Sequence, residues 1–177
     1  MRLPIQQKER IQTERLKLKP YAQQDLEPLV ALITNEAITR TFMVPQLETE
    51  DQAFSLARKL VAYSRPEDTA HLEYGIYLDD RLIGFINDCG IRDEEIEIGY
   101  VVHPDEQGHG YATEAVKAVI SELREMGFRK VTAGYFVENT ASRRVMEKCG
   151  MKQSDQTEEI EYRGRLHQCR YLELCLS

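Results

Sequence analysis

The sequence has 177 residues, a formal net charge of −7 at pH 7, and 42% hydrophobic and 30% charged residues. This length and balance fit one soluble globular domain, and the negative charge disfavours a nucleic-acid-binding protein, which would carry a basic surface. The 4 cysteines form no C-x-x-C pair, so we expect neither a metal site nor a disulfide framework. No run approaches ~18 apolar residues, and the start is too polar for a signal peptide, so we expect a cytoplasmic protein without membrane contact.

The first half of the chain has the patterns of one strand, two helices and a hairpin. Residues 1–12 are polar, and we expect a loose segment there, before a domain that covers residues 13–177. Asp25 and Thr49 each precede an apolar stripe at helical spacing, as N-cap residues do. The expected elements are a strand at 15–18, helices over 26–33 and 50–61, and strands at 72–78 and 81–87 joined by Asp79 and Asp80.

The second half adds one crossover and a closing hairpin. Residues 95–103 alternate as a strand does, and a glycine-containing loop then leads into a helix that Gly127 closes. The other expected elements are a strand at 130–137, a short helix that Asn139 caps and Gly150 ends, and strands at 157–162 and 167–176. The resulting order is β-α-α-β-β-β-α-β-α-β-β. One βαβ crossover among hairpins predicts an α/β domain with a mixed, mostly antiparallel sheet of about seven strands and about four helices.

The loop before the long helix has the chemistry of an anion site. Small residues at Gly108, Gly110 and Ala112 let the backbone approach a ligand closely. The first turn of the following helix leaves N–H groups without intrahelical partners, and its dipole adds positive charge there, which suits a pyrophosphate. A P-loop would need a lysine after the glycines, and a dinucleotide fingerprint would need a glycine where Thr113 stands. A plain tight turn is the alternative.

Gln107-x-x-Gly110-x-Ala112 resembles the acetyl-CoA signature of the GNAT family of N-acetyltransferases, [QR]-x-x-G-x-[GA]. Further segments resemble the ribosomal-protein (RimJ/RimL-like) branch of that family, in the right order along the chain. They are TERL at 13–16, EIGY at 97–100, GYATEA at 110–115 and NTASRRVMEKCG at 139–150. The resemblance implies a single-domain GNAT fold and an enzyme that uses acetyl-CoA as cosubstrate without a metal.

The resemblance also implies where acetyl-CoA binds. Two strands, 101–103 and 130–137, would splay apart so that the thioester lies between them, with the first strand along the pantetheine arm. Asn139 would bond to the acyl carrier, and Arg144 could meet the 3′-phosphate. The implied cofactor-binding residues are Val101, Val102, His103, Gln107, Gly108, His109, Gly110, Tyr111, Ala112, Thr113, Asn139 and Arg144.

The catalytic groups are less determined by the sequence. Glu97 is our candidate base, because burial in an apolar strand would raise its pKa, but alternation could equally place it on a wet face. His103 is an alternative base. Many relatives have a tyrosine acid where this chain has Met146. Our candidate is therefore Ser142, which could protonate the thiolate itself or hold a water, with Tyr135 as a weaker substitute. We assign the oxyanion to the N–H of Val102.

The acceptor stays open at this level. The branch resemblance favours a protein N-terminal amine, while a small amine such as a polyamine, amino sugar or antibiotic is the alternative. An acidic cleft with several carboxylates would favour polyamines. A catalytically silent acyl-CoA-binding module is the third reading. The acceptor pocket is expected between the connector at 42–44, the first two helices and the hairpin near 162–167, in a monomer or a homodimer.

Overall fold

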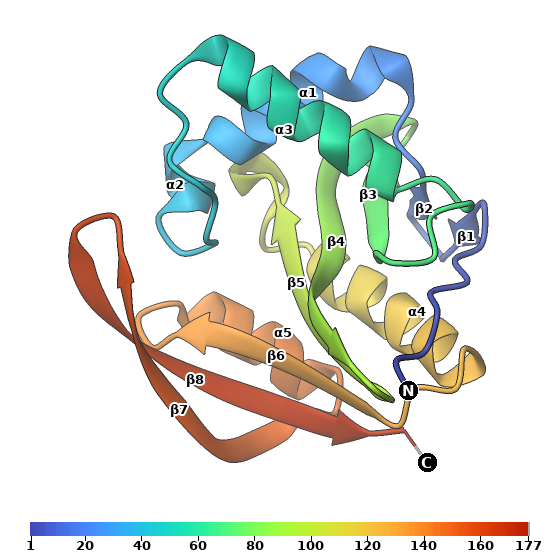
Figure 1. The fold of residues 1–177 in the computed structure, drawn as a ribbon, viewed down its shortest axis with the longest axis vertical. Coiled ribbons are helices and arrows are strands. Elements are labelled where there is room, and N and C mark those ends of the chain that lie inside the picture. Colours follow the sequence, from blue (N-terminus) through green and yellow to red (C-terminus); the bar gives the residue numbers. More distant parts are fainter. Residues whose placement is uncertain (177) are drawn as a thin grey trace.

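A computed structural model describes residues 1–176, which form one mixed sheet of eight strands with helices on both faces (Figure 1). The strands are β1 (Ile11–Gln12), β2 (Lys17–Lys19), β3 (Glu73–Leu78), β4 (Arg81–Arg92), β5 (Glu95–Val102), β6 (Lys130–Phe136), β7 (Lys152–Tyr162) and β8 (Arg165–Cys175). The helices are α1 (Leu26–Thr34), α2 (Glu36–Thr39), α3 (Glu50–Tyr63), α4 (Tyr111–Glu125) and α5 (Thr140–Lys148). No helix in this part of the chain is long and apolar enough to cross a membrane.

The sheet order is β1-β2-β3-β4-β5-β6-β8-β7, and every neighbouring pair is antiparallel except β5 and β6. The predicted α/β fold and its mostly antiparallel sheet are therefore confirmed. Two short elements, β1 and α2, were not expected. Helix α2 has only four residues and depends on Asn35, whose side chain accepts the N–H groups of Ala37 and Ile38. Elements this short leave no periodic pattern to recognise.

The N-caps expected for the first two predicted helices, Asp25 and Thr49, differ in outcome. Thr49 caps α3 through a hydrogen bond from the N–H of Gln52 (3.2 Å). Asp25 precedes α1, but its carboxylate makes no cap bond to that helix. It accepts instead from the N–H of Ala22 (2.8 Å) and the hydroxyl of Tyr77 (2.7 Å). The Asp25 carboxylate therefore binds Tyr77 on the distant strand β3 and not an N–H group of α1.

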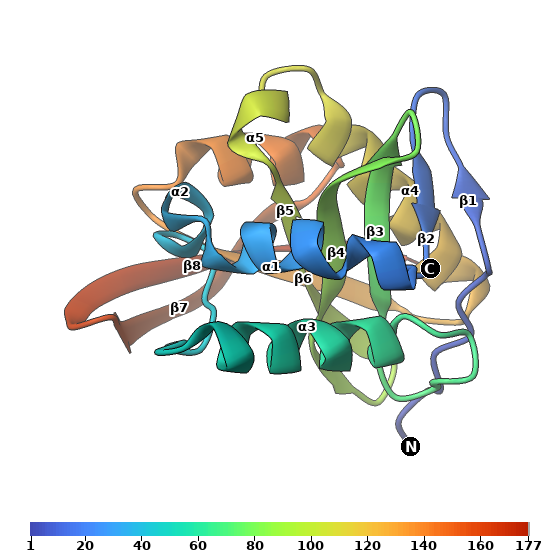
Figure 2. The same ribbon diagram turned by 90° about the horizontal axis from the view of Figure 1, so that it is seen from above.

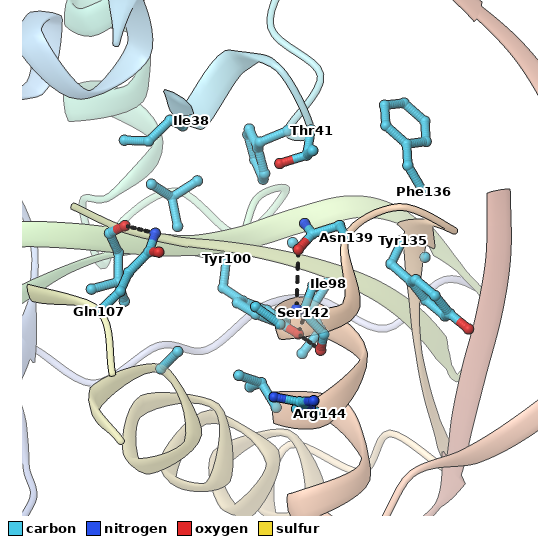
Figure 3. Close-up of a pocket in the computed structure, with 18 of the residues that line it drawn as sticks. Ile38, Thr41, Ile98, Tyr100, Gln107, Tyr135, Phe136, Asn139, Ser142 and Arg144 are labelled. Atoms are coloured by element: carbon cyan, nitrogen blue, oxygen red, sulfur yellow. Dashed lines mark hydrogen bonds between the residues drawn. The ribbon is translucent and has the colours of Figure 1, made fainter. Parts of the chain in front are cut away.

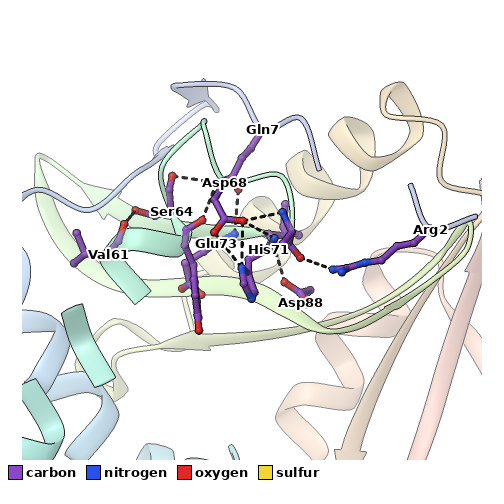
Figure 4. A network of polar contacts seen from close by, with 11 residues as sticks. Arg2, Gln7, Val61, Ser64, Asp68, His71, Glu73 and Asp88 are labelled. Carbon is purple, nitrogen blue, oxygen red and sulfur yellow. Dashed lines mark hydrogen bonds and ion pairs between the residues drawn. The ribbon is translucent and has the colours of Figure 1, made fainter. Parts of the chain in front are cut away.

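The N-terminal segment is packed against the domain, so the expectation of a loose segment was wrong. Ile5 is fully buried in the main core, and Gln7 is 6% exposed. The Gln7 side chain donates to the carbonyl of Ser64 (3.0 Å) and accepts from the N–H of Glu73 (3.0 Å), within the polar network of Figure 4. Gln7 thus satisfies backbone groups where α3 ends and β3 begins, a role that its polarity alone does not reveal.

Two apolar layers cover the sheet, one on each face, and β5 contributes to both. In Figure 2, α1 and α3 lie together across one face, while α4 and α5 lie on the other. Ile96 and Ile98 pack with the α4 layer, and Val101 packs with the α1–α3 layer. This alternation follows from the two-residue period of a strand. Every second residue of β5 therefore faces α4, the helix that follows the predicted cofactor-binding loop.

Candidate active site

The two parallel strands separate beyond Glu97. The backbone pairing of β5 with β6 is confined to residues 95–97 and 130–132, and the strands then diverge toward their ends (Figure 1). The N–H of His103 bonds to the carbonyl of Ile83 on β4 (2.7 Å). Because peptide directions alternate along a strand, the N–H groups of Tyr100 and Val102 point away from β4, into the opening.

A cavity of about 830 Å³ occupies this opening. Its walls come from α2 and the connector that follows it, from β4, β5, β6 and β8, and from the loop and helix α5 on the other side. In Figure 3, Ile38 and Thr41 lie on one side of the opening, and Ser142 and Arg144 lie on the other.

Most of the predicted site residues line this one cavity. They are Glu97, Val101, Val102, Gln107, Gly108, Gly110, Tyr111, Ala112, Thr113, Asn139, Ser142 and Arg144. His103 and His109 do not line it. The Nδ1 atom of His103 accepts from the N–H of Asp105 (3.1 Å), and this bond caps the short turn after β5. The rings of His109 and Tyr111 are stacked, with their centroids 5.5 Å apart. A role of either residue toward a ligand would have to come from its backbone.

The glycine loop exposes a row of backbone amides. Gly108 and Gly110 both have φ +83°, a conformation that side chains disfavour. Gly110 is the N-cap of α4, and the first intrahelical bond runs from the N–H of Glu114 to its carbonyl (3.0 Å). The N–H groups of the three residues before Glu114 therefore have no helix partner. The Gln107 side chain fixes the loop to β5 through the carbonyl of Val102 (3.0 Å).

Helix α5 brings a serine and two cations to the cavity. The Asn139 side chain caps the helix by accepting the N–H of Ser142 (3.2 Å), as the sequence predicts. The Ser142 hydroxyl lies 3.0 Å from the hydroxyl of Tyr100, which also donates to the Ser142 carbonyl (2.9 Å). Burial raises the pKa of Tyr100, so its hydroxyl keeps its proton at neutral pH. Arg144 and Lys148 line the same wall.

Glu97 stands at the last paired position of β5, half-buried in the cavity. Burial raises the pKa of its carboxyl above the ordinary value, and the charge of Glu158 adds to this effect, while the thiol of Cys89 opposes it. Its side chain is partly exposed, and it makes no ion pair with any group of residues 1–176. A carboxylate of this kind can accept a proton near neutral pH more readily than an exposed one.

The sequence profile of the Acetyltransferase (GNAT) domain matches residues 15–152. The chain belongs to the GNAT family of acetyltransferases. It is an acetyl-CoA-dependent N-acetyltransferase, in agreement with similar proteins such as the uncharacterized N-acetyltransferase YoaA of Bacillus subtilis. YoaA is 27% identical over 159 residues, which cover 87% of this chain and 89% of YoaA.

Solved GNAT structures have the same fold. RimL, the ribosomal L7/L12 α-N-protein acetyltransferase in complex with coenzyme A, superposes with a TM-score of 0.82 at 17% identity, over 94% of this chain and 98% of RimL. The spermidine N-acetyltransferase of Vibrio cholerae, in complex with CoA and spermine, gives 0.77 at 20% identity, over 92% of this chain and 96% of that enzyme. At these identities the likeness concerns the fold alone.

This cavity matches the expected acceptor pocket only in part, because no residue of α1 or α3, the first two expected helices, is among the residues that line it. The connector lines it through Phe42 and Met43, but β8 contributes Cys169 and Tyr171, beyond the expected hairpin residues. Tyr162 instead supports the end of α2 and the connector, because its hydroxyl donates to the carbonyl of Thr39 (2.5 Å) and accepts from the N–H of Val44 (3.3 Å). Within residues 1–176, no group of three His, Cys, Asp or Glu side chains is placed to hold a metal ion.

Several lining residues were missed by sequence reasoning. They are Asn87, Asp88 and Cys89 on β4, Tyr100 on β5, Lys148 on α5 and Tyr171 on β8. Only Tyr100 and Lys148 lie inside segments that carry the family resemblance. The β4 residues lie beside an irregularity in the pairing with β5, between Asp88 and Gly90, which no local pattern predicts.

Proposed function

We propose that the protein transfers the acetyl group of acetyl-CoA to a primary amine that attacks the thioester directly in the β5–β6 opening. One observation carries this proposal: the cavity joins the amide-lined loop at its α4 end to the carboxylate of Glu97 at the last paired position of β5. A donor site and a base therefore face one another across an open strand edge.

The donor would lie along the loop, α5 and the free edge of β5. The unpartnered amides at the start of α4 suit the pyrophosphate, and the positive φ of Gly108 and Gly110 keeps side chains out of its way. Arg144 and Lys148 offer positive charge to the remaining phosphate. The outward N–H groups of β5 can pair with the amide groups of the pantetheine arm as a neighbouring strand would.

The reaction then needs a base, a donor that stabilises the oxyanion, and an acid. The amine nitrogen forms a bond to the carbonyl carbon, and the nitrogen passes its proton to Glu97, directly or through water. The N–H of Val102 stabilises the oxyanion that forms on the carbonyl oxygen. When the carbon–sulfur bond breaks, the sulfur takes a proton from the Ser142 hydroxyl while that hydroxyl takes one from a water molecule, so that Ser142 stays neutral; Tyr100 holds Ser142 in place through the 3.0 Å contact.

Two acceptor classes follow from different features. The RimJ/RimL-like segments favour a protein N-terminal amine. A small polyamine is favoured by acidic lining residues: Asp88, whose Oδ1 accepts the N–H of Leu72 (2.8 Å), and Glu97 both line the cavity and make no ion pair within residues 1–176, whereas Glu106 is paired with Arg81 (2.9 Å). Unpaired carboxylates in a cavity attract a cationic ligand.

The test is the release of free thiol from acetyl-CoA over a panel of amines: monoamines, diamines, spermidine, aminoglycosides and short peptides with free N-termini. Transfer to any of them supports the proposal. Asp88→Asn should raise the KM for polyamines and leave that for monoamines unchanged, whereas the surface variant Asp51→Asn should change neither. If coenzyme A binds but no amine of the panel releases thiol, the protein is a silent acyl-CoA-binding module.

A further inference from the structure

The turn before β2 is bound to the donor loop by a set of contacts that the proposed chemistry does not use. Thr13 and Arg15, in the TERL segment, meet the first turn of α4 almost one hundred residues later in the chain. The centre of the contact is Glu114, whose side chain is 16% exposed. This arrangement connects the N-terminal segment directly to the proposed pyrophosphate site.

Glu114 receives three hydrogen bonds from that turn. The Thr13 hydroxyl donates at 2.5 Å, and the N–H and the Nε of Arg15 each donate at 2.8 Å. Burial alone would raise the pKa of Glu114, but these bonds lower it below the ordinary value. The carboxylate is therefore charged at neutral pH, and it holds the guanidinium in one orientation.

The other end of the Arg15 guanidinium reaches the loop itself. Its Nη1 donates to the carbonyl of His109 (2.9 Å), and the group lies over the ring of Tyr111, 4.6 Å from the centroid. Its Nη2 is 3.4 Å from the place that a Cβ on Gly110 would occupy. Arg15 thus spans from a side chain of α4 to a backbone carbonyl between the two positive-φ glycines.

The carbonyl that Arg15 holds belongs to the same peptide unit as the N–H of Gly110. Because a trans peptide is planar, its C=O and N–H point in opposite directions. A bond that fixes the His109 carbonyl on the Arg15 side therefore fixes the Gly110 N–H on the opposite side. Glycine on each side of His109 leaves this peptide otherwise free to turn.

We propose that Arg15 is a positioning residue of the donor site, which holds the His109–Gly110 peptide with its N–H toward the pyrophosphate. This inference rests on the proposed binding of acetyl-CoA at the loop. It predicts a specific effect: loss of Arg15 weakens the binding of coenzyme A and spares the acceptor. Lysine at this position can pair with Glu114 but has no rigid fork that reaches the carbonyl at the same time.

The experiment compares Arg15→Ala and Arg15→Lys with Lys17→Ala. Lys17 belongs to the same N-terminal region and pairs with Asp80 (3.0 Å), away from the loop, so its loss is a matched control. We expect Arg15→Ala to raise the Kd for coenzyme A and the KM for acetyl-CoA roughly tenfold, with kcat and the acceptor KM unchanged. Arg15→Lys should recover thermal stability more fully than affinity. Lys17→Ala should bind coenzyme A like the wild type.

Calorimetry with coenzyme A separates the possible failures. Wild-type protein that does not bind coenzyme A would refute the proposed function. Wild-type affinity in Arg15→Ala, or an affinity that Arg15→Lys restores fully, would refute the positioning role alone. Amide exchange of residues 107–113 in folded Arg15→Lys gives an independent readout: it should accelerate in the free protein, and unchanged protection would count against the inference even if Arg15→Ala does not fold.

Discussion

Gly108 and Gly164 offer a matched pair for testing the donor loop. Both have positive φ, +83° and +76°, and at both positions an added Cβ would meet no atom within 4 Å. Alanine should therefore cost about 1–2 kcal/mol of folding free energy at either site through backbone strain alone. This corresponds to a fall of roughly 2–8 °C in Tm for a chain of this size. Gly164 lies in the β7–β8 turn, whereas Gly108 lines the cavity.

The two variants should differ only in ligand binding. At Gly108 the methyl group would stand where the pyrophosphate approaches the amides, and the loss of one charge-assisted bond is worth about 1.5–3 kcal/mol. We expect the Kd for coenzyme A to rise roughly 10- to 100-fold in Gly108→Ala and to stay at the wild-type value in Gly164→Ala. Calorimetry and thermal unfolding of both proteins measure these effects. Equal affinities, together with equal losses of Tm, would show that the loop does not hold the pyrophosphate.

Further predictions concern three carboxyl and hydroxyl groups. Glu97→Gln should lower kcat/KM by roughly a hundredfold at pH 7. The deficit should shrink as the pH approaches the amine's pKa of about 10, and a constant deficit would make Glu97 structural. Ser142→Ala should lower kcat and spare the Kd for coenzyme A; an unchanged kcat would exclude it as the acid. Burial raises the pKa of Glu73 to about 8, so the folded protein keeps a proton that the unfolded chain loses near 4.5. Stability should fall between these two values by up to about 1.4 kcal/mol per pH unit. Glu73→Gln should reduce this slope, and an unaltered slope in urea titrations would exclude Glu73 as its source.

The sequence predicts the glycine loop and the cap of α5, which both line the cavity, because the groups involved are local. The loop from Gln107 to Thr113 is one continuous segment, and its amides depend on glycine conformations and on the start of a helix. The cap of Asn139 on α5 is likewise a contact between residues three apart. Contacts between residues a few positions apart leave a pattern that can be recognised in a single sequence.

The other walls of the cavity, where we propose that the acceptor binds, could not be predicted in the same way, since they are assembled from distant segments. Asp88 comes from β4, Phe42 from the connector and Tyr171 from β8. The same limit applies to Asp25, whose side chain binds Tyr77 rather than its own helix, and to Arg15, whose partner lies 99 residues away. In each case a contact with a distant residue determines the role of the side chain, whereas the local sequence suggested a helix cap for Asp25 and a strand position for Arg15.

Strand β5 accounts for how the proposed catalytic groups reach one thioester from three directions. Its pairing with β6 ends at Glu97, and that side chain lies on the face toward Cys89 and the connector. The Tyr100 side chain points to the opposite face, where it holds Ser142 on α5. The N–H of Val102 points along the plane of the sheet into the opening, because peptide directions alternate. The proposed base, acid and oxyanion donor would therefore be separated by the elementary geometry of one strand, and an acceptor that entered from the Glu97 face would meet the thioester on the side opposite Ser142. In the proposed direct attack the amine would approach the thioester from the Glu97 face while Ser142 stands near the departing sulfur, so that both proton transfers could occur in one ternary complex.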